Sequence, residues 1–509
     1  MQNVSVLRHG IAAGFWLLLP FVCWGGGLDA GQTWEGKVMA GAPKFSMEDI
    51  QGKRCHKLEG RGLHEAGRWE CRMGIEGGKE YQLMAQLKAA GWFRDGFRLA
   101  IVFKKNNEKI SERVGTAFKT TLDRWMSFSL IAQAPSEANE AVVQVQVSSI
   151  VGALWLKDMG WTPAPFSRKL PPGWHRGYLH YHTSFFFAKP YMVTHAELAS
   201  GMKELGADFV FCAGDHFDEY NPAAVPADYW TRYFDDCLAW NRQDPSCLLI
   251  PAPEAHCSYH SQAASVTPIM DACHTLIPSL DKSIIPQFLF KTLKASPYIQ
   301  AAHARRCSVT ICHPVVTERC GAPSVLNSPD LENMDYLGLE ERDAFRRHYV
   351  AFLKRPLSAK MGAYSEVDSS AYRHPREHPG INRATYFYVE NGFNPENLLH
   401  AWEKRRTYAV FGDFLHFTRL SPVPGLDAVR QANPPAIDFE AQGADNTEIK
   451  KVEIYRNGEL AFDQAVCGKN SCSFSWKDDK MAATERHYVV CIETKKGMLV
   501  TSPIHFAAP

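Results

Sequence analysis

Alternation of apolar and polar residues with a period of two dominates the first third of the chain. In the segment 143–147, Val-Gln-Val-Gln-Val, valines occupy one face of the expected strand and glutamines a solvated face. Glycines and charged turns separate further short strand-like runs such as 81–87, and no strong helical pattern intervenes. This pattern predicts an all-β sandwich or jelly roll over residues 31–165.

The rhythm changes to alternating strands and helices beyond the proline-rich stretch 162–173. Thr194 and Glu197 form a capping box that predicts the start of a helix. Buried strands are expected at 177–182, 208–212, 247–250 and 308–312, and helices at 340–354 and 395–406. Buried strands separated by helices are typical of a parallel sheet, so residues 166–420 are predicted to form a β/α barrel.

The pattern returns to strands over residues 421–509. The runs 451–455 and 488–492 are strand-like, and Asn457-Gly458 is a strong hairpin signal. We therefore expect a C-terminal immunoglobulin-like β-sandwich. Since the period changes at both borders of the central region, no continuous sheet is expected to cross them.

The amino end has the order of regions found in secretory signal peptides. Arg8 precedes the apolar run 11–23, and glycines and Ala30 follow. The run is shorter than the roughly 20 residues that span a bilayer. Residues 1–30 are thus predicted to be a signal peptide of an exported protein, with no membrane segment beyond it.

Length and charge narrow the class of protein. A chain of 509 residues exceeds one ordinary hydrophobic core, in agreement with several domains. The 56 basic and 55 acidic residues nearly cancel, so the composition gives no support for a nucleic-acid partner.

Cysteine usage depends on the compartment. Export permits disulfides, and Cys55 with Cys71, and Cys467 with Cys472, are plausible local bridges. Three other cysteines lie in or beside the apolar strands of the central region, where a small buried hydrophobic residue is the commoner role: Cys212, Cys257 and Cys312.

A histidine pair ends the first strand of the central region. Residues two apart in a strand share a face, so His180 and His182 are expected to project together, with Leu179 and Tyr181 facing the other way. Paired imidazoles suit zinc, iron, manganese or nickel. The alternative is a pair of hydrogen-bonded polar residues at a barrel mouth.

Residues of ligand type recur after the later strands: Asp215, His216, Glu254, His256, His260, His313 and Asp368. The active sites of β/α barrels collect at the carboxyl ends of their strands. The recurrence therefore favours a metal site over isolated structural histidines.

The ordered motifs LHYHTS (179–184), GADFVFCAGDH (206–216), IPAPE (250–254) and ICHP (311–314) resemble those of the PHP (polymerase and histidinol phosphatase) superfamily. Residues 382–413 further resemble the end of exported CehA/McbA-type metallohydrolases. The resemblance covers residues 174–420 and implies a PHP-type distorted β/α barrel that hydrolyses phosphoesters or related bonds with two or three metal ions.

The resemblance also implies ligand roles. His180, His182, Glu254 and Asp368 would hold a first ion, and Glu254 would bridge to a second held by His313 and either His256 or His260. His216 would bind a third ion, with Asp215 beside it to orient groups or handle protons. Because 183–188 lacks a histidine or aspartate and no histidine closely follows Asp368, two divalent ions, of zinc, manganese or iron, are expected.

The predicted function is an exported, phosphoesterase-like hydrolase that uses a metal-activated hydroxide on a small-molecule or glycan-linked ester. Asp215 and His216 are the expected catalytic groups, and Lys189, Arg305 or Arg383 could bind the substrate anion. Two alternatives stay open. One is an amidohydrolase-type enzyme, and the other is a carbohydrate-binding surface protein that has lost catalysis, using tryptophans at 69, 92, 125 and 155.

Overall fold

The computed structural model describes residues 34–50, 52–93, 96–114, 122–163, 170–183, 194–214, 228–258, 272–284, 295–319, 333–355, 360–369, 383–412, 415–430, 435–443, 447–479 and 486–507. Strands predominate over helices in these segments. The signal-like residues 1–30 lie outside them. No helix in the described part of the chain is long and apolar enough to span a membrane.

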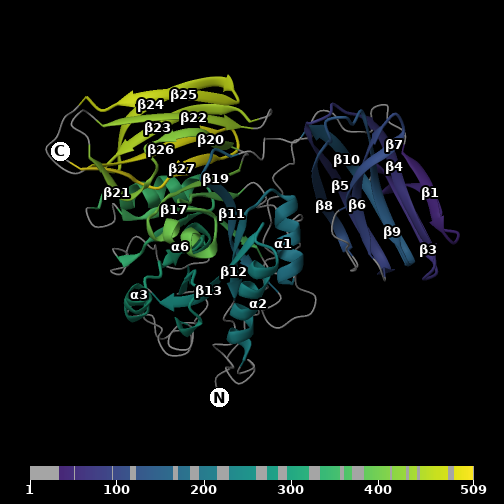
Figure 1. The fold of residues 1–509 in the computed structure, drawn as a ribbon, viewed down its shortest axis with the longest axis horizontal. Helices are drawn as coiled ribbons and strands as arrows, with labels where there is room; N and C mark the ends of the chain where they lie inside the picture. Colours follow the sequence, from purple (N-terminus) through teal and green to yellow (C-terminus); the bar gives the residue numbers. More distant parts are fainter. Residues whose placement is uncertain are drawn as a thin grey trace, which may run out of the picture.

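The first described strands form two sheets that face each other across one hydrophobic cluster (Figure 1). The first sheet runs in the order β1 (Glu35–Ala40), β4 (Ala66–Gly74), β9 (Glu140–Ser148), β6 (Phe97–Lys105) and β7 (Glu108–Val114). The second runs β2 (Lys44–Ile50), β3 (Lys53–Arg61), β10 (Ile150–Pro163), β5 (Glu80–Phe93) and β8 (Leu122–Gln133). The expected β-sandwich is therefore present.

One detail of this sandwich differs from expectation. Gln144 and Gln146 of β9 are buried rather than solvated. Gln144 donates to Glu70 (3.2 Å), and Gln146 accepts from Arg98 (3.0 Å). Because β9 is a central strand, long side chains of the neighbouring strands β4 and β6 cover its outer face. The alternation of valine and glutamine along β9 gives no information about side chains on neighbouring strands, so it did not predict this burial.

The central region contains a parallel series of strands in the order β13 (Leu248–Ser258), β12 (Phe209–Gly214), β11 (Trp174–His182), β17 (Gly362–Ser369), β16 (Tyr336–Leu339) and β15 (Thr310–Ile311). β14 (Ala272–Leu276) pairs antiparallel with β13. Just beyond β15, Cys312 N donates to the carbonyl of His274 in β14 (2.9 Å). The series thus curves until its two ends meet through β14.

Helices flank this curved sheet: α1 (His195–Glu204), α2 (Tyr229–Gln243), α3 (Ala295–Ala304), α4 (Pro314–Arg319), α5 (Val350–Leu353) and α6 (Pro395–Glu403), with the 3-10 turn η3 (Lys282–Ile284) and the π-helix η6 (Ala344–Tyr349). The predicted capping box at Thr194 and Glu197 is confirmed. Trp402 of α6 stacks on Tyr336 of β16, with ring centroids 3.5 Å apart.

The expected break of the sheet near residue 420 is wrong. β18 (Ala384–Tyr388) pairs with β11, β19 (Thr407–Phe411) pairs with β18, and β19 pairs with β27 (Met498–Thr501) near the end of the chain. A continuous sheet therefore crosses the border. Edge pairing between strands distant in sequence depends on which edge lies open in the folded chain, and the local period does not encode this.

The C-terminal strands complete this extension. β26 (Arg486–Thr494), β23 (Ile449–Arg456) and β24 (Glu459–Lys469) continue the sheet beyond β27, and β28 (Ile504–Ala507) joins β26 to β21 (Gly425–Arg430). A second layer contains β20 (Leu415–Ser421), β22 (Ala436–Gly443) and β25 (Ser471–Lys477). The hydrophobic cluster between the layers includes Phe417, Ile437 and Val490, which makes this part sandwich-like.

The cysteines do not follow the disulfide prediction. Cys55 and Cys71 are both buried and neither forms a disulfide bond, and Cys472 forms none either. The bridge between Cys55 and Cys71 is therefore not formed. These thiols belong to different sheets and act as small buried side chains.

Candidate metal centre

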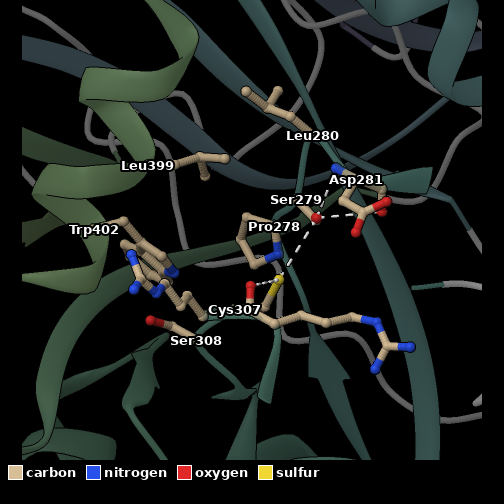
Figure 2. Close-up of a pocket in the computed structure, with 10 residues that line it drawn as sticks. Pro278, Ser279, Leu280, Asp281, Cys307, Ser308, Leu399 and Trp402 are labelled. Atoms are coloured by element: carbon tan, nitrogen blue, oxygen red, sulfur yellow. Dashed lines mark hydrogen bonds between the residues drawn. The ribbon is translucent and has the colours of Figure 1, made fainter. Parts of the chain in front are cut away.

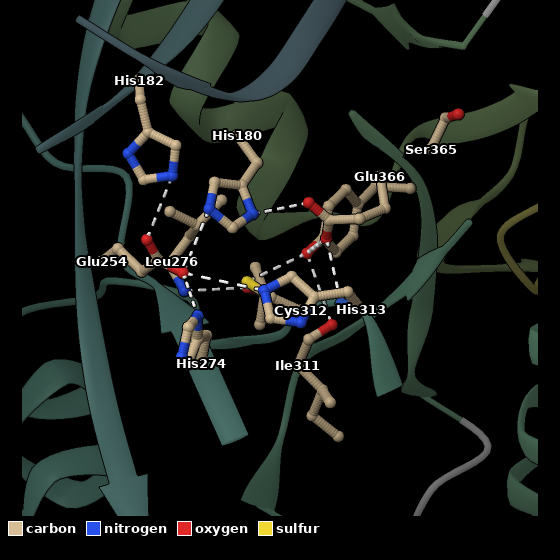
Figure 3. A network of polar contacts seen from close by, with 12 residues as sticks. His180, His182, Glu254, His274, Leu276, Ile311, Cys312, His313, Ser365 and Glu366 are labelled. Atoms are coloured by element: carbon tan, nitrogen blue, oxygen red, sulfur yellow. Dashed lines mark hydrogen bonds and ion pairs between the residues drawn. The ribbon is translucent and has the colours of Figure 1, made fainter. Parts of the chain in front are cut away.

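Six polar side chains from several strands meet near the carboxyl ends of the parallel strands (Figure 3). They are His180 and His182 of β11, Glu254 of β13, His274 of β14, His313 just after β15, and Glu366 of β17. Five of the six are buried, and His274 is partly exposed. Burying so many ionisable groups is costly unless they share a compensating partner.

Glu254 lies at the middle of the group. Its Oε1 is 3.1 Å from His180 Nε2, 2.6 Å from His274 Nδ1 and 3.8 Å from His313 Nε2. Its Oε2 is 3.3 Å from His182 Nε2. One carboxylate therefore faces four imidazoles, two of them at the end of β11.

Glu366 supports the group from the other side. Its Oε1 lies 2.5 Å from His180 Nδ1, and its Oε2 accepts a short hydrogen bond from the Tyr364 hydroxyl. The backbone N–H of His313 also points at Oε2 (3.4 Å). Glu366 thus fixes the ring orientation of His180, which is the usual role of a carboxylate behind a metal-binding histidine.

A β-bulge at His180 changes the predicted strand geometry. The pairing of β11 with both β12 and β17 shifts register at this point, and His180 has a left-handed φ of 65°. Leu179 packs inside the curved sheet, whereas Tyr181 packs against the helices. The expectation that Leu179 and Tyr181 share a face is wrong, but the pair His180 and His182 still converges, with ring centroids 4.9 Å apart.

The electrostatics of the group call for positive charge at its middle. Burial opposes ionisation of Glu254, but His180 and His274 outweigh it and hold the pKa of this carboxyl well below its usual range. Burial also disfavours a charged His180, yet Glu254 and Glu366 hold the pKa of its imidazole well above the usual value. A bound metal cation would balance the negative charge of these carboxylates in the same way, and His180 would then not need to be protonated.

The donor set fits divalent metal ions. His180, His182 and Glu254 offer ligand atoms within 4.8 Å of one another, and so do Glu254, His274 and His313. Glu254 Oε1 makes no hydrogen bond of normal geometry despite the imidazole nitrogens around it. Imidazole nitrogen and carboxylate oxygen suit zinc, manganese or iron. The shared Glu254 fits a carboxylate that bridges two ions.

The structure brings together the predicted residues His180, His182, Glu254 and His313. Asp215, His216 and His260 lie outside the described residues, as does Lys189. His256 and Asp368 lie in β13 and β17, but the structure describes only their backbone. Sequence reasoning missed His274 and Glu366. Glu366 lies two residues before Asp368 on the same strand, so the alternation of that strand could have indicated it.

Figure 2 shows a pocket in the described part of the central region, and none of the six clustered side chains lines it. Its lining includes Ser279, Cys307, Ser308 and Trp402. Cys307 and Ser308 precede β15, whereas His313 follows it, so the pocket opens at the opposite end of that strand. Arg305 also lines this pocket, which argues against a role beside the metal ligands.

Neither a family model nor a curated protein matches the chain. Among solved structures, the enzymatically active domain of bacteriophage CBA120 tailspike protein 4 is 15% identical with a TM-score of 0.23, over 26% of this chain and 19% of that chain. The CBM22-2 xylan-binding domain of Paenibacillus barcinonensis Xyn10C is 9% identical with a TM-score of 0.21, over 26% of this chain and 91% of that chain.

A longer match is the Clostridium thermocellum xylanase 10B structure with CBM22-1 and GH10 modules. It is 13% identical with a TM-score of 0.21, over 65% of this chain and 73% of that chain. The chain spans less than a fifth of the tailspike domain. At these TM-scores the likenesses carry no argument, so the functional conclusion rests on the site geometry.

Proposed function

We propose that the chain is a metal-dependent hydrolase, most closely of the phosphoesterase type. The observation that carries this proposal is the position of Glu254, which belongs to two separate groups of three potential ligands. A carboxylate shared in this way fits two ions a few ångström apart, the arrangement used by many phosphatases and nucleases.

The residues present divide into two sets. His180 and His182 would hold one ion and His274 and His313 the other, with Glu254 between them. Divalent ions held by these residues would supply Lewis acidity toward an ester and a lowered pKa for a bound water. Glu366 would keep His180 Nε2 turned toward Glu254, because it occupies the opposite ring nitrogen.

Arg383 is the basic residue that the geometry favours for the substrate anion. Its Nη1 donates to the backbone carbonyl of Glu366 (3.1 Å), whose side chain belongs to the candidate metal centre. A guanidinium has five N–H donors, so this contact leaves donors that could meet an anionic ester oxygen. Of the three basic residues considered from sequence, Arg383 is therefore the one we assign to substrate binding.

The curved parallel sheet supports the further proposal of a PHP-type β/α barrel. Apart from His274 on the antiparallel β14, the proposed ligand residues lie at or near the carboxyl ends of parallel strands, where β/α barrels place their sites. With the four sequence motifs at these strand ends, we retain the resemblance to exported CehA/McbA-type hydrolases as a proposal. Export remains part of it, and sequencing the mature amino end should give a start near Gly31.

The test is a panel of chromogenic phosphomonoesters, phosphodiesters and carboxyl esters. The full chain, stripped with chelator, should hydrolyse at least one phosphoester after addition of manganese, zinc or iron(II), and the His182→Ala variant should not. His348 is a buried histidine held by Glu318 (2.7 Å), so His348→Ala is the matched control and should keep the activity. Equal activity of wild type and His182→Ala would refute the assignment.

A carbohydrate-binding protein without catalysis is the second candidate. Of the four tryptophans considered, Trp69 is buried, Trp125 and Trp155 are half-buried, and for Trp92 only the backbone is described. Lys157 lies over the Trp125 ring, 4.2 Å from its centroid. Retention on immobilised polysaccharide in the presence of chelator, with no hydrolysis of any ester, would favour this candidate.

A further inference from the structure

A second cluster of potential ligands lies outside the candidate metal centre. His195 is the first residue of α1, Cys212 lies in β12 and Cys237 in α2. All three side chains are buried between the two helices and the sheet. From the sequence, Cys212 was predicted to be only a small buried hydrophobic residue, and no role was predicted for His195 or Cys237.

The atoms of this cluster have the spacing of a metal coordination shell. One ligand atom from each residue lies within 4.8 Å of the others. Cys237 Sγ is 3.6 Å from His195 Nε2. Zinc bonds of about 2.3 Å to sulfur and about 2.0 Å to nitrogen in a tetrahedron separate these two atoms by about 3.5 Å.

A fourth group stands at a suitable place. The Thr183 hydroxyl oxygen is 3.3 Å from His195 Nε2 and is fully buried. An oxygen and a nitrogen bound to one tetrahedral zinc ion lie about 3.3 Å apart. Thr183 also follows His182 directly, so this position connects the second cluster to the end of β11.

We propose that His195, Cys212 and Cys237 bind a structural zinc ion, with the fourth position at the Thr183 hydroxyl or a water beside it. Two thiolates and an imidazole form a soft donor set that prefers zinc to magnesium or calcium. The ion would tie α1 and α2 to β12 and to Thr183 at the end of β11.

This inference does not depend on the proposed hydrolase activity. To separate the two sites, the full chain is prepared as a His180→Ala, Glu254→Gln double variant, which disables the candidate metal centre. We expect it to retain one equivalent of zinc after dialysis, with a sulfur shell at about 2.3 Å in X-ray absorption. Adding Cys237→Ser should abolish that equivalent. Adding Cys247→Ser should not, because Cys247 is a buried cysteine outside the cluster.

Three results would overturn the proposal. The first is equal zinc content with and without Cys237→Ser, and the second is a zinc spectrum without sulfur. The third is a disulfide between Cys212 and Cys237 in the purified chain, seen by mass spectrometry after alkylation. If Cys237→Ser fails to fold, the same double variant loaded with cobalt(II) decides, because thiolate-to-cobalt charge-transfer absorption must appear if the proposal is right and must be absent if it is wrong.

Discussion

Glu366 Oε1 lies 2.5 Å from Nδ1 of His180, although 186 residues separate the two in the chain. β11 and β17 are paired parallel neighbours, so the contact is made directly between adjacent strands. Both side chains are fully buried. This pairing fixes which nitrogen of His180 faces Glu254.

The first prediction concerns this pairing. Glu366→Gln keeps the shape but removes the charge that orients His180, so metal affinity should fall by about 10–100-fold, as for other carboxylates behind histidine ligands. Isothermal titration of the stripped chain with zinc measures it. Glu340 is also buried and accepts from the backbone N–H of Val315 (2.7 Å), so Glu340→Gln serves as control and should leave the affinity unchanged. An unchanged affinity in Glu366→Gln would remove this residue from the site.

The second prediction concerns His274, which the motifs did not indicate. Its Nδ1 is 2.6 Å from Glu254 Oε1, so we expect it to be a direct ligand. Loss of a residue that only supports a metal ligand lowers metal affinity by up to ~100-fold. His274→Ala removes a direct ligand, so it should weaken the binding of the second ion by at least that factor. Titration should show that one of the two binding steps of the candidate metal centre is lost, while the separate zinc proposed at His195, Cys212 and Cys237 is unaffected.

His348→Ala is the control for the loss of a histidine in this part of the fold. It should lower the thermal midpoint, because it leaves the half-buried Glu318 without its imidazole partner, yet retain both binding steps. Two intact binding steps in His274→Ala would show that the second ion uses other ligands.

The third prediction concerns pH. Burial lowers the pKa of His416 to about 4, and likewise that of His505. In the unfolded chain these histidines bind protons near pH 6.5. Between pH 6.5 and 4 the unfolded state therefore binds more protons, so the free energy of unfolding falls as the pH falls, by at most about 1.4 kcal/mol per pH unit for each histidine.

Urea unfolding at pH 7 and pH 5 measures this effect. The loss of unfolding free energy between pH 7 and pH 5 should be smaller in His416→Gln than in the wild type. The control is His400→Gln, at an exposed histidine of α6, and it should show the same loss as the wild type. A loss of the same size in both variants would mean that His416 takes up its proton without unfolding.

The strand periods and the capping box predicted much of the fold, and the order of motifs predicted four side chains that converge in the structure. The parts of the fold that the sequence did not predict depend on contacts between segments far apart in the chain. His274 lies on β14, whose antiparallel position beside β13 closes the curved sheet, and nothing local marks that partner. The continuation through β19 and β27 likewise joins segments far apart in sequence.

The bulge at His180 is the clearest local failure. Strand alternation correctly predicted that His180 and His182 lie together. It also predicted that Leu179 and Tyr181 share a face, which is wrong because the left-handed φ of 65° at His180 turns them to opposite sides. A non-glycine residue in that conformation is costly and concentrates at functional sites. The contacts with Glu254 and Glu366 hold His180 there, and these long-range partners are not visible from its neighbours in sequence.

The most direct measurement is the metal content of the purified full chain, by mass spectrometry of the elements, for the wild type and for Glu254→Gln. If Glu254 joins two ions, the wild type should carry two divalent ions more than the variant, while both show the same circular dichroism. The zinc proposed at His195, Cys212 and Cys237 should be present in both. Equal metal content in the two proteins, with both folded, would contradict the assignment of this cluster as a two-ion hydrolytic centre.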